Sequence, residues 1–275
     1  MAADETLSFE VANGVGWVTI NRPEVLNALD DRVLRELHGL WRSLRSNDDV
    51  RCVVLTGAGD RAFSVGIDRD VFLAGPQDVA GRDGKSVGWG TTPFHFDDPG
   101  AMLGPKAADL WTPVIAAVNG MACGGAFYLL GEADFIIAAE HATFFDPHVT
   151  YGLTAVYEPI HMLQKMPFHE IMRVSLLGNH ERMSARRAFE IGLVSEVVPK
   201  EELLERARWA AEAIASQPPL AVQGTVRAIW TAREMARSQA LSVASSIVAL
   251  GNDPANRAAG QQAFESKQRT EWRLR

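Results

Sequence analysis

Alternating apolar and polar residues at the start of the chain predict a pair of antiparallel strands. The stretch "LSFEVANGVGWVTINRP", residues 7–23, alternates on both sides of Asn13-Gly14, and Asn-Gly between alternating runs is typical of a tight hairpin turn. The apolar pattern then changes to helical spacing, with Asp30 or Asp31 placed to cap a helix. The apolar residues at this spacing are Val33, Leu34, Leu37, Leu40, Trp41 and Leu44.

Three later runs are almost wholly apolar and rich in β-branched residues, which predicts buried strands. They are residues 50–59, 112–120 and 133–139. Helical segments lie between these runs, and strands that alternate with helices indicate an α/β fold.

Two further regions differ from this pattern. Residues 74–105 are crowded with glycine, proline and aspartate, and a loop this long inside a compact domain is usually functional or mobile. From about residue 200 the pattern is helical, with a break at Pro218-Pro219. We therefore expect a core over residues 1–199 and a helical region over residues 200–275.

Composition narrows the class of protein. The 275 residues are 47% hydrophobic and 22% charged, which fits a globular protein, and the formal net charge of −7 without a long basic run argues against nucleic-acid binding. No secretory signal opens the chain, and no apolar run reaches the ~18 residues of a membrane span. Cys52 and Cys123 lie in apolar stretches and are expected to be buried free thiols, so we expect a cytoplasmic protein.

Adjacent glycines between an expected strand and an expected helix give the first candidate site. In "VNGMACGGAF", residues 118–127, Gly124 and Gly125 precede a helix start, where free N–H groups favour an oxygen that carries negative charge. Gly66 forms a second join of this kind. If the two joins converge, their N–H groups would bind one carbonyl oxygen from two sides, although glycine pairs also serve turns and close packing.

Five collinear motifs resemble the enoyl-CoA hydratase/isomerase, or crotonase, superfamily. The resemblance spans roughly residues 8 to 270. The motifs are "NRPEVLNAL" (21–29), "VVLTGAGDRAFSVGID" (53–68), "AAVNGMACGGAF" (116–127), "ADFIIAAEHATFFDP" (133–147) and "RRAFEIGLVSEVVP" (186–199).

The resemblance implies a spiral core of repeated strand–strand–helix units, a helical C-terminal trimerisation region, and assembly as a homotrimer or a dimer of trimers. It implies binding of an acyl-CoA thioester, as in fatty acid and other lipid metabolism, with no cofactor beyond coenzyme A. The thioester oxygen would lie in an oxyanion hole formed by the backbone N–H groups of Ile67 and Gly125.

The resemblance also implies contacts to coenzyme A. For the charged residues among these, solvated surface charges are the alternative interpretation. The implied residues are Arg22, Leu26, Gly66, Asp68, Gly124, Phe264 and Lys267, the last two from the same chain or from a neighbouring subunit.

The sequence departs from the family at both hydratase glutamates, where it has Tyr128 and His148. Tyrosine is a poor base at neutral pH but a candidate donor, and histidine can serve as acid or base. Glu158 is a further candidate acid, and Asp146 is placed to orient His148. The alternatives are a loop histidine with local hydrogen bonds and, for Glu158, a carboxylate at a helix start.

Three other features have competing interpretations. His95 lies in the long loop, where it either closes over a substrate or is an ordinary loop residue. Asp97 and Asp98 have metal-ligand chemistry, but no second cluster has ligand spacing, so no metal is predicted. Aromatic residues fall around the expected acyl site. Core packing explains most of them, but several together suggest a bulky or cyclic acyl group. They are Trp89, Phe94, Phe96, Trp111, Phe127, Tyr128, Phe144, Phe145, Tyr151 and Tyr157.

Three functions fit this sequence. The first is an enoyl-CoA hydratase or isomerase reaction, a lyase or isomerase activity, with His148, Tyr128 and Glu158 transferring protons. The second is hydrolysis of a thioester or of a carbon–carbon bond on the same scaffold. The third is acyl-CoA binding without catalysis, because a fold can persist after its chemistry is lost.

Overall fold

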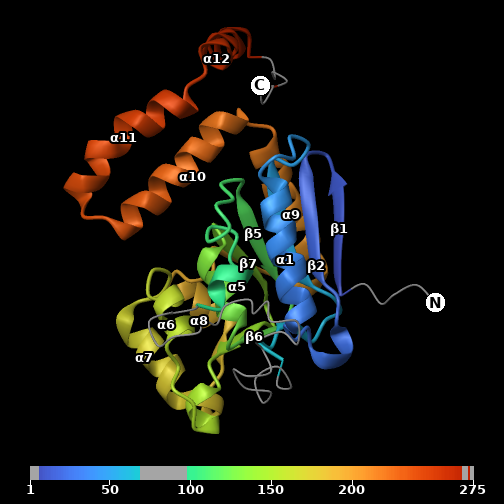
Figure 1. The fold of residues 1–275 in the computed structure, drawn as a ribbon. Coiled ribbons are helices and arrows are strands. Elements are labelled where there is room, and N and C mark those ends of the chain that lie inside the picture. The colour runs from blue at the N-terminus through green and yellow to red at the C-terminus, as the bar shows by residue number, and fades with distance from the viewer. Residues whose placement is uncertain (1–5, 69–97, 268–271, 273–275) are drawn as a thin grey trace, which may run out of the picture.

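Two β-sheets form the framework of the protein (Figure 1). The computed structural model describes residues 6–68, 98–267 and 272. The larger sheet has the strand order β1-β2-β3-β5-β7-β10, and the smaller has the order β4-β6-β8-β9. The larger sheet consists of β1 (Leu7–Ala12), β2 (Val15–Ile20), β3 (Cys52–Gly57), β5 (Val114–Val118), β7 (Phe135–Ala139) and β10 (Glu196–Val198).

The predicted hairpin and buried strands are confirmed. β1 and β2 pair antiparallel from Leu7 opposite Ile20, and the turn residues Asn13 and Gly14 have φ values of 53° and 77°, as a two-residue hairpin requires. β3, β5 and β7 pair in parallel. Every residue of β3 and β5 is buried.

Each of the parallel strands β3, β5 and β7 is followed along the chain by a strand of the smaller sheet. The second strands are β4 (Ala62–Ser64), β6 (Met121–Cys123) and β8 (Thr143–Phe145), and they too pair in parallel. β9 (Met183–Ser184) closes the smaller sheet as an antiparallel edge strand. The chain therefore advances one step in both sheets with each repeat, which is the predicted spiral.

Helices cover both faces of the larger sheet. Side chains of a strand alternate between faces, so Cys52 and Val54 pack against α9 (Leu203–Ala215), while Val53 and Leu55 face the core on the other side, as does α1 (Asp31–Leu44). Asp30 caps α1 by accepting the N–H of Val33 at 2.9 Å. The boundary predicted at residues 199–200 stays a prediction, but α9 packs with the sheet.

The remaining elements surround the smaller sheet or extend beyond it. α5 (Ala126–Glu132), α7 (Phe168–Leu177) and α8 (Ala185–Glu190) contact the smaller sheet, while α4 (Gly100–Leu103) and α6 (Tyr157–Met162) pack against α5. Single 3₁₀ turns lie at η1 (Pro23–Val25), η2 (His148–Tyr151), η3 (Gly178–His180) and η4 (Lys200–Glu202). None of the helices in the described part of the chain is long and apolar enough to cross a bilayer.

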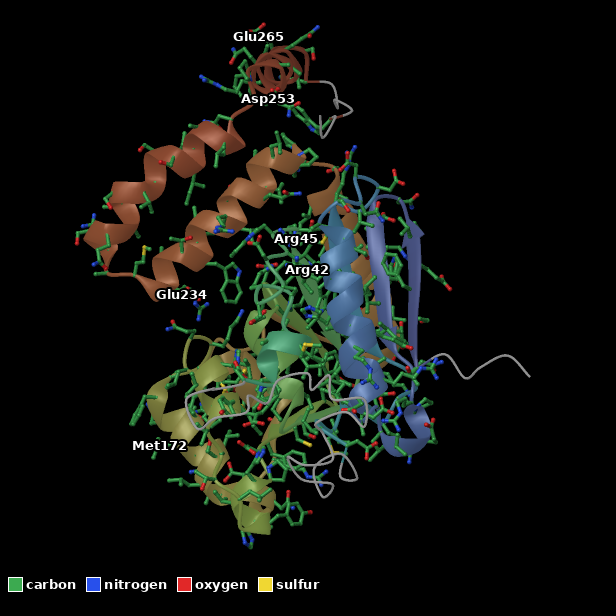
Figure 2. All side chains as sticks on the ribbon, viewed as in Figure 1. Arg42, Arg45, Met172, Glu234, Asp253 and Glu265 are labelled. Atoms are coloured by element: carbon green, nitrogen blue, oxygen red, sulfur yellow. The ribbon has the colours of Figure 1, made fainter. Side chains whose placement is uncertain are left out.

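Three C-terminal helices project away from the sheets. α10 (Pro219–Glu234) and α11 (Arg237–Gly251) form an antiparallel pair, and α12 (Pro254–Ser266) follows at the far end of the molecule (Figure 1). α11 and α12 have no buried residue, and Figure 2 shows the labelled side chains of Asp253 and Glu265 far from both sheets. Trp230 anchors α10 by donating its Nε1–H to Asp134 Oδ1 at 2.7 Å.

Two buried asparagines fix the turn between β3 and β4. Asn119 accepts the N–H of Gly57 at 3.2 Å and donates to the carbonyl oxygens of Gly57 at 2.8 Å and Gly59 at 2.7 Å. Asn27 donates to the carbonyl of Ala62 at 2.8 Å. These amides satisfy backbone groups of a turn that cannot satisfy itself, and the turn leads directly to Gly66.

We predict that Asn119→Ala lowers the free energy of unfolding by about 2–4 kcal/mol, because it leaves buried backbone groups without partners. Urea denaturation followed by circular dichroism measures the change. Asn179→Ala is the matched control, since Asn179 is exposed and its loss should change stability by less than about 0.5 kcal/mol. Equal effects of the two substitutions would contradict the role given to Asn119.

Candidate functional site

The backbones of two glycine turns, one after β4 and one after β6, approach each other closely. Gly66 has φ of 86° and Gly124 has φ of 52°, conformations that glycine adopts readily. A Cβ atom on Gly66 would lie 2.9 Å from the oxygen of Cys123 and closer still to the nitrogen of Gly125. A Cβ on Gly125 would lie 2.9 Å from the nitrogen of Ile67. The approach therefore excludes side chains at both positions.

The N–H groups of Ile67 and Gly125 lie at this approach. Residues on either side of Ile67 bond to Leu29: the Leu29 N–H donates to the Gly66 oxygen at 2.8 Å, and the Asp68 N–H donates to the Leu29 oxygen at 2.9 Å. The N–H of Ile67 is thus directed away from this pairing. Among residues 6–68 and 98–267, no acceptor is found for the N–H of Ile67 or of Gly125.

A cluster of three polar side chains, Tyr128, His148 and Glu158, lies beside the glycine turns. A Cβ on Gly124 would lie 3.7 Å from Cε1 of His148. The Tyr128 hydroxyl donates to Glu158 Oε1 at 2.7 Å, and His148 Nε2 lies 3.5 Å from the same oxygen. Tyr128 is 2% and Glu158 5% exposed, so these groups interact where water competes little.

Asp146 and Glu158 raise the pKa of His148. Asp146 accepts a hydrogen bond from His148 Nδ1 and another from the His148 N–H at 3.2 Å. The hydrogen bond to Asp146 raises the pKa of His148 above its usual value; burial opposes this, and the charge of Glu158 adds to it. Burial, with the neighbouring Glu158 charge, raises the pKa of Tyr128, so its phenol stays protonated and donates.

A second acid–histidine pair lies on the other side of Tyr128, and the sequence did not single it out. His161 Nε2 lies 2.7 Å from Asp98 Oδ2, and the His161 ring meets the Tyr128 ring edge-on, with centroids 5.4 Å apart. His161 follows Glu158 by three residues on α6, a spacing that places both on one helix face. That spacing is the signal that could have identified His161.

The structure places part of the predicted coenzyme A contacts near the glycine turns. Arg22 pairs with Asp68 at 3.0 Å and with Asp30 at 3.3 Å, so its charge is engaged within the chain. Leu26 has a left-handed φ of 57°, and its carbonyl oxygen accepts the N–H of Val65 at 3.2 Å. These contacts join the segment around Leu26 to the turn that carries Gly66.

The other predicted contacts lie apart from this segment. Phe264 is 82% exposed on α12, and Lys267 follows the end of that helix. α12 lies at the opposite end of the molecule from η1 (Figure 1), so these residues and Leu26 of one chain do not meet. His95, Trp89, Phe94, Phe96 and Asp97 lie outside the described residues.

Among the described aromatic residues, Phe127, Tyr128, Phe144 and Phe145 are buried, whereas Tyr151 is 69% exposed. The inference of a bulky acyl group stays a prediction. Within the described ranges, no three histidine, cysteine, aspartate or glutamate side chains gather as around a metal ion.

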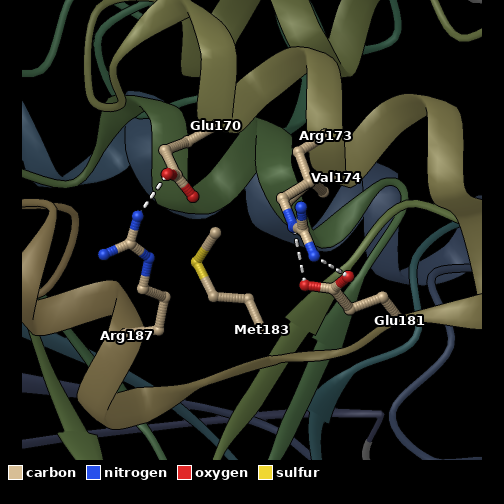
Figure 3. Close-up of a pocket in the computed structure, with 6 residues that line it drawn as sticks. All are labelled: Glu170, Arg173, Val174, Glu181, Met183 and Arg187. Atoms are coloured by element: carbon tan, nitrogen blue, oxygen red, sulfur yellow. Dashed lines mark hydrogen bonds and ion pairs between the residues drawn. The ribbon is translucent and has the colours of Figure 1, made fainter.

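A hollow of about 260 Å³ lies elsewhere, between α7, β9 and α8 (Figure 3). Its charged side chains are already paired: Arg173 binds Glu181 with two hydrogen bonds of 2.9 and 2.6 Å, and Arg187 donates to Glu170. None of its lining residues belongs to the glycine turns or to the cluster of Tyr128, His148 and Glu158. We therefore base the candidate site on the glycine turns.

Comparison with known proteins identifies the family. A sequence model described as enoyl-CoA hydratase/isomerase matches residues 10–275. The chain belongs to the enoyl-CoA hydratase/isomerase family. The crotonase-type resemblance is thereby confirmed, and family membership supports acyl-CoA processing.

The chain is similar to a hydratase, a dehydratase and a hydratase/isomerase from other organisms. It is 32% identical over 262 residues to (E)-benzylidenesuccinyl-CoA hydratase of Thauera aromatica, covering 94% of this chain and 95% of that one. It is 34% identical to a carnitinyl-CoA dehydratase of Salmonella arizonae, covering 79% and 77%. A crystal structure of an enoyl-CoA hydratase/isomerase from Mycobacterium paratuberculosis matches it with a TM-score of 0.85 and 35% identity, over 99% of this chain and 100% of that chain.

We predict that Gly66→Ala reduces both stability and acyl-CoA binding, because its Cβ would meet backbone atoms that cannot yield. Gly192→Ala isolates the cost of the left-handed backbone, since Gly192 has φ of 83° and open space around it; that cost is about 1–2 kcal/mol. Gly66→Ala should lower the free energy of unfolding by at least about 1 kcal/mol more than Gly192→Ala does. Chemical denaturation and calorimetric titration with an acyl-CoA measure the two effects, and identical behaviour of the two variants would refute the close approach.

Proposed function

We propose that this protein adds water to, or removes water from, the coenzyme A thioester of an α,β-unsaturated acid. The observation that carries the proposal is the approach of two backbone N–H groups, on Ile67 and Gly125, that have no acceptor in the described part of the chain and lie beside the cluster of Tyr128, His148 and Glu158. The hydratase and dehydratase relatives favour water addition over isomerisation.

In the proposed reaction the thioester oxygen accepts hydrogen bonds from Ile67 and Gly125. When water attacks Cβ, negative charge develops on this oxygen, and two fixed N–H donors stabilise it most in the transition state. The donors are backbone atoms, so the side chain of Ile67 is not needed for this role. Removing one such donor in other enzymes costs about 10²–10³ in kcat.

Glu158 and His148 divide the proton transfers. Glu158 takes the proton from the attacking water, and the imidazolium of His148 delivers a proton to Cα. Nε2 lies 3.5 Å from Glu158 Oε1, so the proton gained by Glu158 can pass to His148 and restore both groups. Tyr128 donates to the same Oε1 and holds the carboxylate in place.

Incubation with a panel of straight-chain and aryl enoyl-CoA thioesters, followed by mass spectrometry, tests the proposal. We predict gain of one water, and a fall in kcat of roughly 10²–10⁴-fold in Glu158→Gln because the base is lost. Tyr128→Phe should reduce kcat less, since the carboxylate stays. Tyr151→Phe is the matched control, because Tyr151 is 69% exposed.

The alternatives give different products in this experiment. Release of free coenzyme A would indicate thioester hydrolysis, a ring-opened acid would indicate carbon–carbon cleavage, and isomerisation would leave the substrate mass unchanged. Tight binding without turnover across the panel would indicate a binding protein. Full hydratase activity in Glu158→Gln would refute the assignment of Glu158 as the base.

We also infer that the protein works as a homotrimer or a dimer of trimers. The C-terminal helices expose Leu241 (59%), Leu250 (82%) and Phe264 (82%), and a partner subunit would cover such apolar residues. A neighbouring α12 would then bring Phe264 and Lys267 to the coenzyme A of the next subunit, as the resemblance implies.

Sedimentation velocity should therefore give about three or six times the chain mass of 30.0 kDa. Leu250→Glu should shift the protein toward monomer, because a charge would be buried in the interface. Val11→Glu places the same charge on the edge strand β1, where Val11 is 44% exposed, and should leave the assembly unchanged. A wild-type monomer at micromolar concentration would contradict the inference.

A further inference from the structure

We propose that Asp146 is a positioning residue that holds His148 in the tautomer with its proton on Nδ1, so that Nε2 faces Glu158 and the two groups act as one acid–base pair. This inference rests on the proposed function for its catalytic meaning. The tautomer and the charge of His148 are properties of the protein without substrate and can be measured there.

The place of Asp146 in the fold makes it rigid. It follows β8 directly, and β8 pairs with β6, the strand that leads into the glycine turn. The Gly124 N–H donates to the Phe145 oxygen at 3.4 Å, which ties the two strand ends together. Asp146 is 0% exposed. Its carboxylate therefore has a fixed position relative to Gly125.

The hydrogen bonds of Asp146 decide the tautomer. Its Oδ1 accepts the His148 backbone N–H and also faces Nδ1. An ionised carboxylate can only accept, so Nδ1 carries the proton. In the neutral ring, Nε2 is then the acceptor, and it faces Glu158. Nε2 is thus the nitrogen that gains or loses the mobile proton.

The charge of Asp146 acts mainly on His148. No lysine or arginine of the described chain pairs with Asp146, and its Oδ2 is buried without a hydrogen-bond partner there. If Asp146 served only to stabilise the turn, one oxygen that accepts the His148 N–H would be enough, and a neutral side chain could supply that oxygen. Among the described residues, His148 is the ionisable side chain that hydrogen-bonds this buried carboxylate. Such an arrangement instead points to control of the proton on His148.

The other charged groups around His148 are few. Glu158 on α6 and Tyr128 on α5 face it through the shared Oε1. The burial of Cys123 on β6 raises the pKa of its thiol to about 12; the Arg182 charge opposes this, and the Asp146 charge adds to it. The Arg182 guanidinium stacks on Phe145 at 4.5 Å. The Asp98–His161 pair lies beyond Tyr128.

Long-range ¹H–¹⁵N NMR of the histidine-labelled full chain tests the proposal without any substrate. His148→Gln assigns the signals. Above its pKa, His148 in the wild type should show a protonated Nδ1. Asp146→Asn keeps an oxygen for the backbone N–H but removes the charge, so His148 should titrate about one pH unit lower or more.

Kinetics give the second readout. Because the imidazolium is the proposed acid, activity falls as pH rises through the pKa of His148, and this fall should move to lower pH in Asp146→Asn. At neutral pH kcat should drop roughly 10–10³-fold with KM nearly unchanged. Asp109→Asn is the matched control, because Asp109 is half exposed and pairs with Arg45 and Arg227, which belong neither to the glycine turns nor to the cluster of Tyr128, His148 and Glu158.

The outcomes separate this inference from the proposed function. A wild-type His148 protonated on Nε2 when neutral, or an unchanged titration in Asp146→Asn, would overturn the role of Asp146. If Asp146→Asn does not fold, the wild-type tautomer alone decides. If no thioester in the panel gains water but the NMR results are as predicted, the proposed reaction fails and the positioning of His148 stands.

Discussion

Contact between two backbones is the constraint on which the site depends. Gly66 and Gly125 meet at a distance that no Cβ atom could occupy, and Gly66 has a left-handed conformation as well. Two N–H groups can then point at one small volume, which side chains would otherwise fill. Each repeat of the chain adds one strand to each sheet. The two glycine turns therefore follow neighbouring strands of the smaller sheet and lie next to each other.

The approach also needs support from outside the glycines. Asn27 and Asn119, both buried, bind backbone groups of the turn that leads into β4, and the parallel pairing of β4, β6 and β8 sets the ends of these strands side by side. Gly66, Gly125 and Asp146 each follow the end of one of these strands. A rigid sheet edge thus holds both the N–H donors and the carboxylate that contacts His148.

The sequence allowed much of this to be predicted, for physical reasons. Period-two alternation and apolar runs identified the hairpin and the three buried strands, because burial imposes those patterns locally. Motif order identified the fold. The contact of Tyr128 with Glu158, 30 residues apart, depends on how α5 and α6 pack, and that of His161 with Asp98 joins α6 to the residue before the cap of α4. Local sequence patterns carry no information on such contacts. The ion pairs of Arg22 with Asp30 and Asp68 could not be predicted from the sequence for the same reason.

By the resemblance, Tyr128 and His148 stand where hydratases of the family have glutamates, and the carboxylate of Glu158 lies beside both of them. Glu158 enters from α6, and the two replacing side chains both contact its Oε1. A lone buried carboxylate would be costly, whereas one that accepts from a phenol and faces an imidazolium is stabilised. Tyr128, His148 and Glu158 therefore form one interdependent set: Tyr128 and His148 stabilise the buried carboxylate of Glu158, and in the proposed reaction Glu158 exchanges the proton with His148.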